Sequence, residues 1–154
     1  MQASTIKENV ISPECKCLYH FTDERNLDSI REHGLLSWPL LLQTGIAHVP
    51  ASSELSRELD ARHGLENYVR LCLTRYHPML NCAVGDPTRI FSRPTWIRVH
   101  PAVIRWETTL FSDMNATANL ANIGDDPWIA FNSGSSQAEV MVLGRIEPKY
   151  LALP

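Results

Sequence analysis

The segment 18–35 restricts the possible folds of this chain more than any other stretch. It reads LYHFTDERNLDSIREHGL. Its first residues are typical of a short strand that ends at a polar pair, His20 and Thr22, and the pattern that follows predicts an amphipathic helix with Asp23 as its N-cap. Gly34 suits the position just beyond the end of that helix. A polar pair between a strand and a helix is a common way to hold the ribose and phosphates of a nucleotide.

Length and composition favour one soluble domain. The chain has 154 residues, 44% of them hydrophobic and 20% charged, which suits a single core. We therefore expect one domain over 1–154, in which 1–13 form a loose lead-in. No apolar run is long enough to span a bilayer, and the polar start of the chain lacks the apolar stretch of a secretory signal. These features predict a cytoplasmic protein with no membrane partner.

Charge and cysteine content argue against two further classes of protein. Fourteen basic and seventeen acidic residues give a net charge of −3, which disfavours a protein that coats nucleic acid but allows a local basic groove. Cys15 and Cys17, followed by His20, hint at a metal site. A closed zinc site needs a fourth ligand, and Cys72 and Cys82 do not form a second close pair. We therefore expect no metal.

Hydrophobic patterning predicts a mixed α+β fold with two helices near the start and several short strands. The predicted helices follow Thr22 and span about 52–63. Residues 111–136 are rich in Asn, Asp, Ser and Gly and are expected to be largely loop, as is the region bracketed by Pro39 and Gly45. The predicted strands are 68–73, 95–100 and 138–143, with 145–148 extending or following the last.

Glu139 is the least expected residue in these strands. It shares a face with Met141 and Leu143, while Val140 and Val142 take the other. A carboxylate in so apolar a strand is costly to bury unless it is paired or used in chemistry. The alternative is an edge-strand glutamate that faces water and discourages pairing with other chains. Periodicity alone leaves both interpretations open.

Several other polar residues have a functional and a structural interpretation. Ser136 and Gln137 lie in the loop before Glu139, where they can hold a substrate over the carboxylate. His20 can equally be a histidine with one ring nitrogen bonded to backbone, and Thr22 a helix cap. Judged one at a time, most such residues are structural.

Four blocks of sequence follow one another in order along the chain. They are Tyr19-His20-Phe21-Thr22 with Asn26-Leu27, Ile30 and Gly34-Leu35; Tyr68-Val69 with Pro78-Met79-Leu80; Phe111-Ser112-Asp113 with Asn115-Ala116; and Gln137-Ala138-Glu139-Val140. Taken together, these blocks resemble the DarT-like ADP-ribosyltransferases over about residues 18–150. The resemblance implies an ADP-ribosyltransferase-like split β-sheet core with flanking helices. It also implies an enzyme that uses nicotinamide adenine dinucleotide (NAD) to modify a nucleic-acid base, typically thymidine in single-stranded DNA, and a toxin paired with an antitoxin protein.

The resemblance also implies roles for individual residues. It places His20 and Thr22 against the dinucleotide, with Asn26 close by and Tyr68 lining the nicotinamide pocket. Breaking the bond between nicotinamide and ribose builds positive charge on the sugar, as in glycoside hydrolysis. A carboxylate beside the ribose 2′-hydroxyl orients the sugar and stabilises that charge, a role that suits Glu139.

The acceptor side of the expected site is less clearly defined. An arginine ahead of the strand at 68–73 is implied to contact the phosphates and to position the acceptor base. Arg57 aligns best with it, and Arg62 is the alternative. The sequence departs from the family at Asn115, where many relatives carry histidine, and at Tyr76-His77, where many have a second basic or aromatic residue. Both departures affect which base or polymer is modified.

The leading hypothesis is therefore a transferase that moves ADP-ribose from NAD to a base in single-stranded nucleic acid. DNA is favoured, and RNA is the alternative within the same chemistry. A second class is an enzyme that modifies protein or hydrolyses NAD. A third is a binding module without catalysis, in which Glu139 is an ordinary strand residue.

Overall fold

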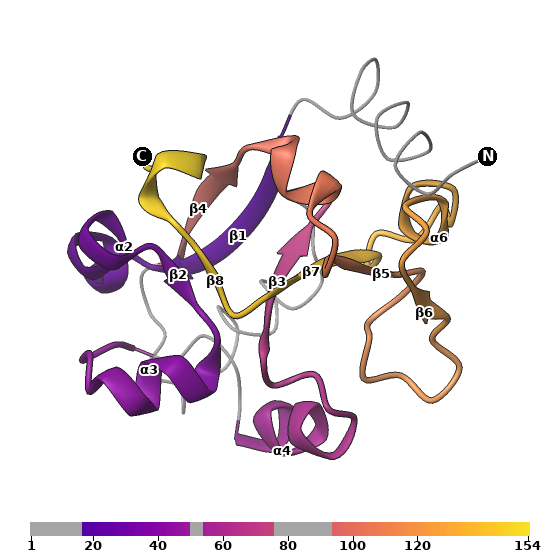
Figure 1. Ribbon diagram of the computed structural model, residues 1–154, viewed down its shortest axis with the longest axis horizontal. Coiled ribbons are helices and arrows are strands. Elements are labelled where there is room, and N and C mark those ends of the chain that lie inside the picture. Colours follow the sequence, from indigo (N-terminus) through magenta and orange to yellow (C-terminus); the bar gives the residue numbers. More distant parts are fainter. Residues whose placement is uncertain (1–16, 50–53, 76–93) are drawn as a thin grey trace.

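The structure is a computed structural model that describes residues 17–49, 54–75 and 94–154 (Figure 1). It contains both helices and strands, as the sequence predicts. In chain order its elements are β1 (Leu18–Asp23), η1 (Glu24–Asn26), α2 (Leu27–His33), β2 (Leu35–Leu36), α3 (Trp38–Thr44), α4 (Glu54–Arg62), β3 (Tyr68–Cys72), β4 (Pro94–Val99), η2 (Pro101–Arg105), β5 (Leu110–Ser112), β6 (Ile123–Gly124), α6 (Trp128–Phe131), β7 (Glu139–Leu143), β8 (Arg145–Ile146), η3 (Pro148–Tyr150) and β9 (Leu151–Ala152).

Within the described residues, seven strands form one sheet in the order β6-β5-β7-β3-β1-β4-β9, and β2 and β8 form a separate two-stranded pair. All the pairings are antiparallel. β7 lies between β5 and β3, so the strand that carries Glu139 is central. The interpretation of Glu139 as an edge-strand residue facing water is therefore wrong, and the residue is 4% exposed.

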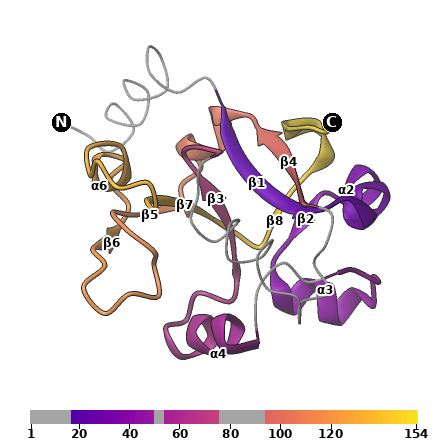
Figure 2. The ribbon, with the colours of Figure 1, turned by 180° about the vertical axis from the view of Figure 1, so that it is seen from behind.

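The sheet is split between β1 and β3. β1 pairs with β4 along its whole length, but its register with β3 is the single pair Tyr19–Cys72. Beyond that pair the two strands diverge (Figure 1). The view from behind shows α3 and α4 on the side where these strands separate (Figure 2). The split opens the sheet toward these helices.

The two faces of β7 separate core from site. Val140 and Val142 join the main apolar core, whereas Met141 belongs to a second cluster with Leu65 and Ala116. The period-2 alternation of a strand places Glu139 on the Met141 face, as the sequence pattern predicts. Glu139 therefore points away from the main core.

The predicted helix after Thr22 and the strands at 68–73, 95–100 and 138–143 are present, with small shifts at their ends. Asp23 caps η1, the short 3-10 helix that leads into α2, by accepting the backbone N–H of Arg25, and Gly34 ends α2 with a φ of 81°. The predicted helix at 52–63 is observed as α4, and its first two residues lie outside the described part. Residues 111–136 are mostly loop but include β6 and α6.

The expectation of a loop bracketed by Pro39 and Gly45 is wrong, because this region forms α3. Pro39 lies in the first turn of that helix, where its missing N–H has no helical partner to lose. Gly45 ends the helix in the left-handed conformation, with a φ of 68°. Both residues are thus helix boundary signals. The predicted lead-in at 1–13 lies outside the described residues.

Candidate active site

A cavity of about 240 Å³ lies where β1 and β3 separate. Its volume is near the lower end of small-ligand pockets, which span roughly 300 to 1,000 Å³. One part of the wall is apolar and comes largely from β1, α2, β2 and α3. The polar part includes His20, Thr22, Asp60, Tyr68, Arg70 and Glu139.

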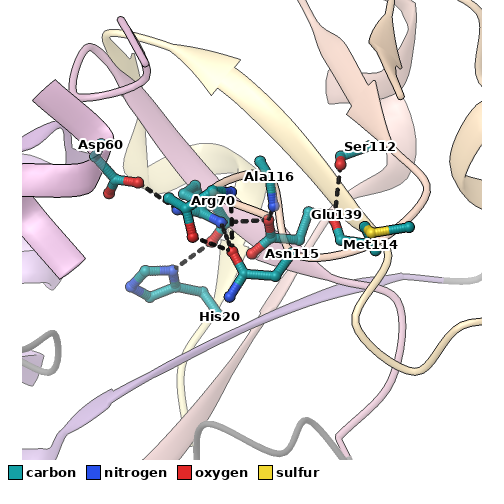
Figure 3. Close-up of polar contacts among 9 residues, drawn as sticks. His20, Asp60, Arg70, Ser112, Met114, Asn115, Ala116 and Glu139 are labelled. Carbon is teal, nitrogen blue, oxygen red and sulfur yellow. Dashed lines mark hydrogen bonds and ion pairs between the residues drawn. The ribbon is translucent and has the colours of Figure 1, made fainter. Parts of the chain in front are cut away.

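Glu139 lines this cavity, and its carboxylate lies beside Arg70, Asn115 and Ala116 (Figure 3). Its Oε2 accepts hydrogen bonds from Arg70 Nη2 at 2.5 Å and from the backbone N–H of Ala116 at 2.9 Å. Among the described residues, none donates a hydrogen bond to Oε1. The carboxylate is therefore held through one oxygen, and the other can accept a bond from a ligand.

Arg70, on β3, links three elements around Glu139 (Figure 3). Besides its bond to Glu139, its Nη1 donates to Asp60 Oδ1 on α4 at 2.5 Å, and its Nη2 donates to Asn115 Oδ1 at 2.9 Å. The neighbouring carboxylates raise the pKa of Arg70, although burial acts against them. The guanidinium is therefore charged at every physiological pH.

The same cluster shifts the pKa values of two neighbours. Burial raises the pKa of Asp60, with the charge of Arg70 opposing the shift and that of Glu139 adding to it. Burial, with Glu139 adding to it, also raises the pKa of the Cys72 thiol to about 12. Cys72 faces Glu139 across the β3–β7 pair and is a free thiol. Because the thiolate is the nucleophile, Cys72 is unreactive near neutral pH.

His20 lies at the point where β1 and β3 separate. Its Nδ1 is 3.1 Å from the backbone carbonyl oxygen of Arg70, so this nitrogen carries the proton and donates. Burial lowers the pKa of His20, with that hydrogen bond opposing the shift. The ring is therefore neutral at pH 7, and its Nε2 is left as an acceptor. The structural interpretation of His20 and its predicted place in the site are both compatible with this geometry.

Thr22 and Asn26 line the cavity, but Asn26 is occupied by protein contacts. Its Nδ2 donates to Thr22 Oγ1 at 3.0 Å and to the carbonyl oxygen of Val49 at 2.8 Å. Its Oδ1 accepts the backbone N–H of Val49 at 2.7 Å. Asn26 thus fixes the chain after α3 as one wall of the cavity, which makes it a support for the site.

The loop after β5 lies against Glu139. Asn115 Oδ1 accepts from Arg70 and from both the backbone N–H and the hydroxyl of Thr117. Among the described residues, none accepts a hydrogen bond from Asn115 Nδ2. The structure therefore brings Asn115 to the edge of the carboxylate cluster and leaves one donor group free.

The remaining predicted site residues are not gathered around the cavity. Arg62 and Ser136 are exposed, Gln137 is half-buried, and all three lie outside the cavity wall. Arg57 lies in α4, but its side chain is outside the described part of the structure. His77 also lies outside the described residues. Tyr68 does line the cavity, and its contact with nicotinamide stays a prediction.

The sequence reasoning missed Arg70, Asp60 and His48, all of which line the cavity. A signal for Arg70 was present, because it is a charge in the apolar strand Tyr-Val-Arg-Leu-Cys, just as Glu139 is in β7. The register of β3 with β7 puts both side chains on one face of the sheet. No local pattern marks Asp60 or His48.

The described part of the chain has neither a cluster of metal ligands nor a membrane-spanning helix. No group of three or more His, Cys, Asp or Glu side chains there can hold a metal ion. No helix there is both long and apolar enough to cross a membrane.

Known structures share this fold. The chain matches Thermosipho africanus DarTG in complex with ADP-ribose at 19% identity and a TM-score of 0.75, covering 89% of this chain and 43% of that one. It matches Thermus sp. 2.9 DarT in complex with ADP-ribosylated ssDNA at 18% identity and a TM-score of 0.65, covering 88% of this chain and 78% of that one. It matches the same Thermus protein in complex with NAD+ at 17% identity and a TM-score of 0.60, covering 90% of this chain and 80% of that one. The fold is thus that of DarT-type ADP-ribosyltransferases, with the split sheet that the sequence predicts.

The sequence itself defines the family more narrowly. The family model described as "ssDNA thymidine ADP-ribosyltransferase, DarT" matches residues 19–133. The chain belongs to the DarT family. No curated protein sequence matches it. The chain spans less than half of the Thermosipho chain, and the family match ends before Glu139.

Proposed function

We propose that this protein transfers ADP-ribose from NAD to thymidine in single-stranded DNA, with Glu139 as the catalytic carboxylate. The main support for this proposal is the geometry of Glu139. Its Oε2 is held by Arg70 and Ala116, while its Oε1 has no described partner and the side chain lines the cavity. The DarT family match supports the choice of substrate.

The proposed chemistry makes use of a buried negative charge. Bound NAD supplies the ADP-ribose, and positive charge builds on the ribose as the bond to nicotinamide breaks. A fixed carboxylate next to that charge stabilises it, and a buried site strengthens the interaction because little water screens it. Oε1 of Glu139 is the oxygen available to accept a ribose hydroxyl. Asp60, Arg70 and Glu139 together carry a net charge of −1 when ionised, which favours the developing positive charge.

Residues on the wall near β1 are proposed to bind the dinucleotide. His20 Nε2 accepts a hydroxyl hydrogen, a role that needs the neutral ring that burial favours. Thr22 and Tyr68 line the same cavity and complete this side. Asn26 acts by holding the wall in place through Val49.

The acceptor base is proposed to approach from the side of Asn115, whose free Nδ2 can donate to a base carbonyl. Arg57 is proposed to contact the phosphates and to position that base. Ser136, Gln137 and His77 remain predicted contacts of the nucleic acid. In the transfer, the bond from ribose to nicotinamide is replaced by one to the base, and the displaced proton leaves to solvent.

A labelling experiment tests the substrate. The protein is incubated with NAD labelled in the adenylate, and separately with single-stranded DNA oligonucleotides that contain or lack thymidine, with RNA, and with protein. We expect label only on the thymidine-containing DNA. Label on RNA alone would replace DNA by RNA as the acceptor, and label on protein would contradict the proposal. Release of nicotinamide with no labelled acceptor would indicate an NAD hydrolase.

We further propose that the protein acts as a toxin restrained by an antitoxin protein. The family resemblance supports this, as does the similarity to DarTG, of which this chain covers 43%. Expression of the wild type is expected to arrest growth of a bacterial host, and Glu139→Ala is expected to relieve the arrest. Equal growth arrest by both forms would contradict a toxicity that depends on this site.

A further inference from the structure

We infer that Arg70 is a positioning residue that orients Glu139 and fixes it to the loop carrying Asn115. The inference rests on the proposed function, because it concerns how the catalytic carboxylate is held. Arg70 contacts residues from α4, from the loop after β5 and from β7 with a single guanidinium. Among the described residues, no other side chain forms hydrogen bonds to α4, to the loop after β5 and to β7 at once.

The contacts are partly buried, which increases their effect relative to contacts on the open surface. The side chains of Arg70, Asp60 and Glu139 are 19%, 18% and 5% exposed. Charge-assisted hydrogen bonds are stronger than neutral ones, and screening by salt is weak where water is excluded. An exposed surface pair would have little influence on a neighbouring group, but this cluster determines where the Glu139 carboxylate lies.

Arg70 and Ala116 bond to the same oxygen of Glu139, and this fixes the direction of the carboxylate. A glutamate side chain has several rotatable bonds, so one backbone N–H leaves it able to swing about Oε2. The second bond, from Arg70, restricts that motion and leaves Oε1 without a partner among the described residues. A planar guanidinium suits this task because its donors point in fixed directions toward separate acceptors.

Arg70 also sets the charge balance of the site. Without it, the partly buried carboxylate of Asp60 and the buried carboxylate of Glu139 have no described counter-ion between them. Asp60, whose pKa burial already raises, is then expected to take up a proton first. The Glu139 carboxylate would lose its fixed position and Asn115 would lose one of its donors. The catalytic step should suffer more than NAD binding.

The test compares Arg70→Gln and Arg70→Lys with the wild type. Steady-state kinetics of nicotinamide release give kcat and KM, calorimetry gives the Kd for NAD, and thermal melting reports folding. We expect Arg70→Gln to lower kcat by about 10- to 100-fold, the range for one buried charged hydrogen bond, with less than about a threefold change in Kd. Arg70→Lys keeps the positive charge but lacks the planar guanidinium, so its kcat should lie between those of Arg70→Gln and the wild type.

Chemical rescue separates positioning from a merely structural role. Guanidinium ion at low millimolar concentration should restore part of the kcat of Arg70→Ala, because the site opens on the cavity. The same ion should leave the wild type unchanged. Arg98→Gln is the matched control, since Arg98 is an exposed arginine on β4 outside the cavity wall, and its kcat should equal that of the wild type.

The outcomes distinguish this inference from the proposed function. A wild type that cleaves NAD while the folded Arg70→Gln and Arg70→Lys variants keep kcat within about threefold would overturn the role of Arg70 and leave the function standing. If Arg70→Gln does not fold, two other results would together overturn the role of Arg70: a wild-type kcat in Arg70→Lys, and no rescue of Arg70→Ala by guanidinium ion. A wild type that neither cleaves NAD nor modifies DNA would overturn the proposed function, and this inference with it.

Discussion

The two ring nitrogens of His20 have different environments, and this difference makes the residue sensitive to pH. Nδ1 donates to the Arg70 carbonyl, where a regular β1–β3 ladder would otherwise continue. The ring thus satisfies a backbone acceptor at the split in the sheet. Protonation would place a charge in a buried position and would remove the acceptor at Nε2. Both structure and proposed ligand binding therefore favour the neutral form.

The sign of the resulting pH dependence can be predicted. Burial lowers the pKa of His20 in the folded state, while in the unfolded chain it is about 6.5. Below that pH the unfolded state binds more protons, so the free energy of unfolding falls as pH falls, by at most about 1.4 kcal/mol per unit from this group. Urea unfolding at pH 7.5 and 5.5 should show a larger loss for the wild type than for His20→Gln. Equal losses would contradict the buried neutral ring.

His48 lines the cavity and has one unsatisfied ring nitrogen. Its Nε2 is buried and has no hydrogen-bond partner in the described part of the chain, and its ring packs edge-on against Trp38 with centroids 5.1 Å apart. A ligand that bonds this nitrogen removes the penalty of leaving it unpaired. His48→Ala should therefore weaken NAD binding by roughly 3- to 10-fold, the effect of one neutral hydrogen bond, with kcat unchanged. Calorimetry showing an unaltered Kd would exclude such a contact.

The sequence pattern singled out Glu139 as a candidate residue but did not single out Arg70. Glu139 stood out because a carboxylate in an apolar strand requires a compensating partner. Arg70 met the same criterion but lay in a strand whose partner was unknown, so its pairing with Glu139 could not be foreseen. The distance between such residues depends on strand order, which local patterns do not determine.

At the scale of elements, the turn between α2 and β2 depends on Gly34. Its φ of 81° and ψ of −167° belong to a region that is essentially restricted to glycine. A Cβ at this position would also lie 2.1 Å from the backbone carbonyl oxygen of Ile146. Ile146 belongs to β8, which pairs with β2, so backbone rather than a movable side chain fills the space.

Gly34→Ala should accordingly destabilise the protein by about 3 kcal/mol or more, the sum of backbone strain and overpacking. Gly64 provides a matched control, since its φ is 71° but a Cβ there would meet nothing within 4 Å. Gly64→Ala should show only the conformational penalty of about 1 kcal/mol. Denaturant unfolding of both variants measures the difference. Similar values for the two would contradict the close approach of β8.

Element prediction was most accurate where the sequence signal was strong: apolar spacing with a C-terminal glycine for α2, and runs of strand-forming residues for β3 and β7. It failed at α3 because Pro39 and Gly45 were taken as loop formers, although each also marks a helix boundary. The short β6 and α6 gave no usable signal. Elements of two to four residues are too short for a periodic pattern to appear.

At the scale of the whole molecule, the site is a consequence of the split sheet. β1 and β3 separate after one paired position, and residues from β1, β3 and β7 then face a common cavity. These strands come from the beginning, middle and end of the chain. Their assembly could be expected only from the resemblance to a family, because pairings this distant in sequence leave no local trace. The matched DarT structures confirm that part of the prediction.

The central claim is that Glu139 drives transfer of ADP-ribose to thymidine in single-stranded DNA. Mass spectrometry of a thymidine-containing oligonucleotide incubated with NAD and either wild type or Glu139→Gln tests it most directly, with melting curves to confirm that both are folded. We expect the wild type to add one ADP-ribose per modified base and the variant to be slower by about 100- to 1,000-fold, the effect of removing a preorganised charge. Modification by the folded variant at the wild-type rate would contradict the claim.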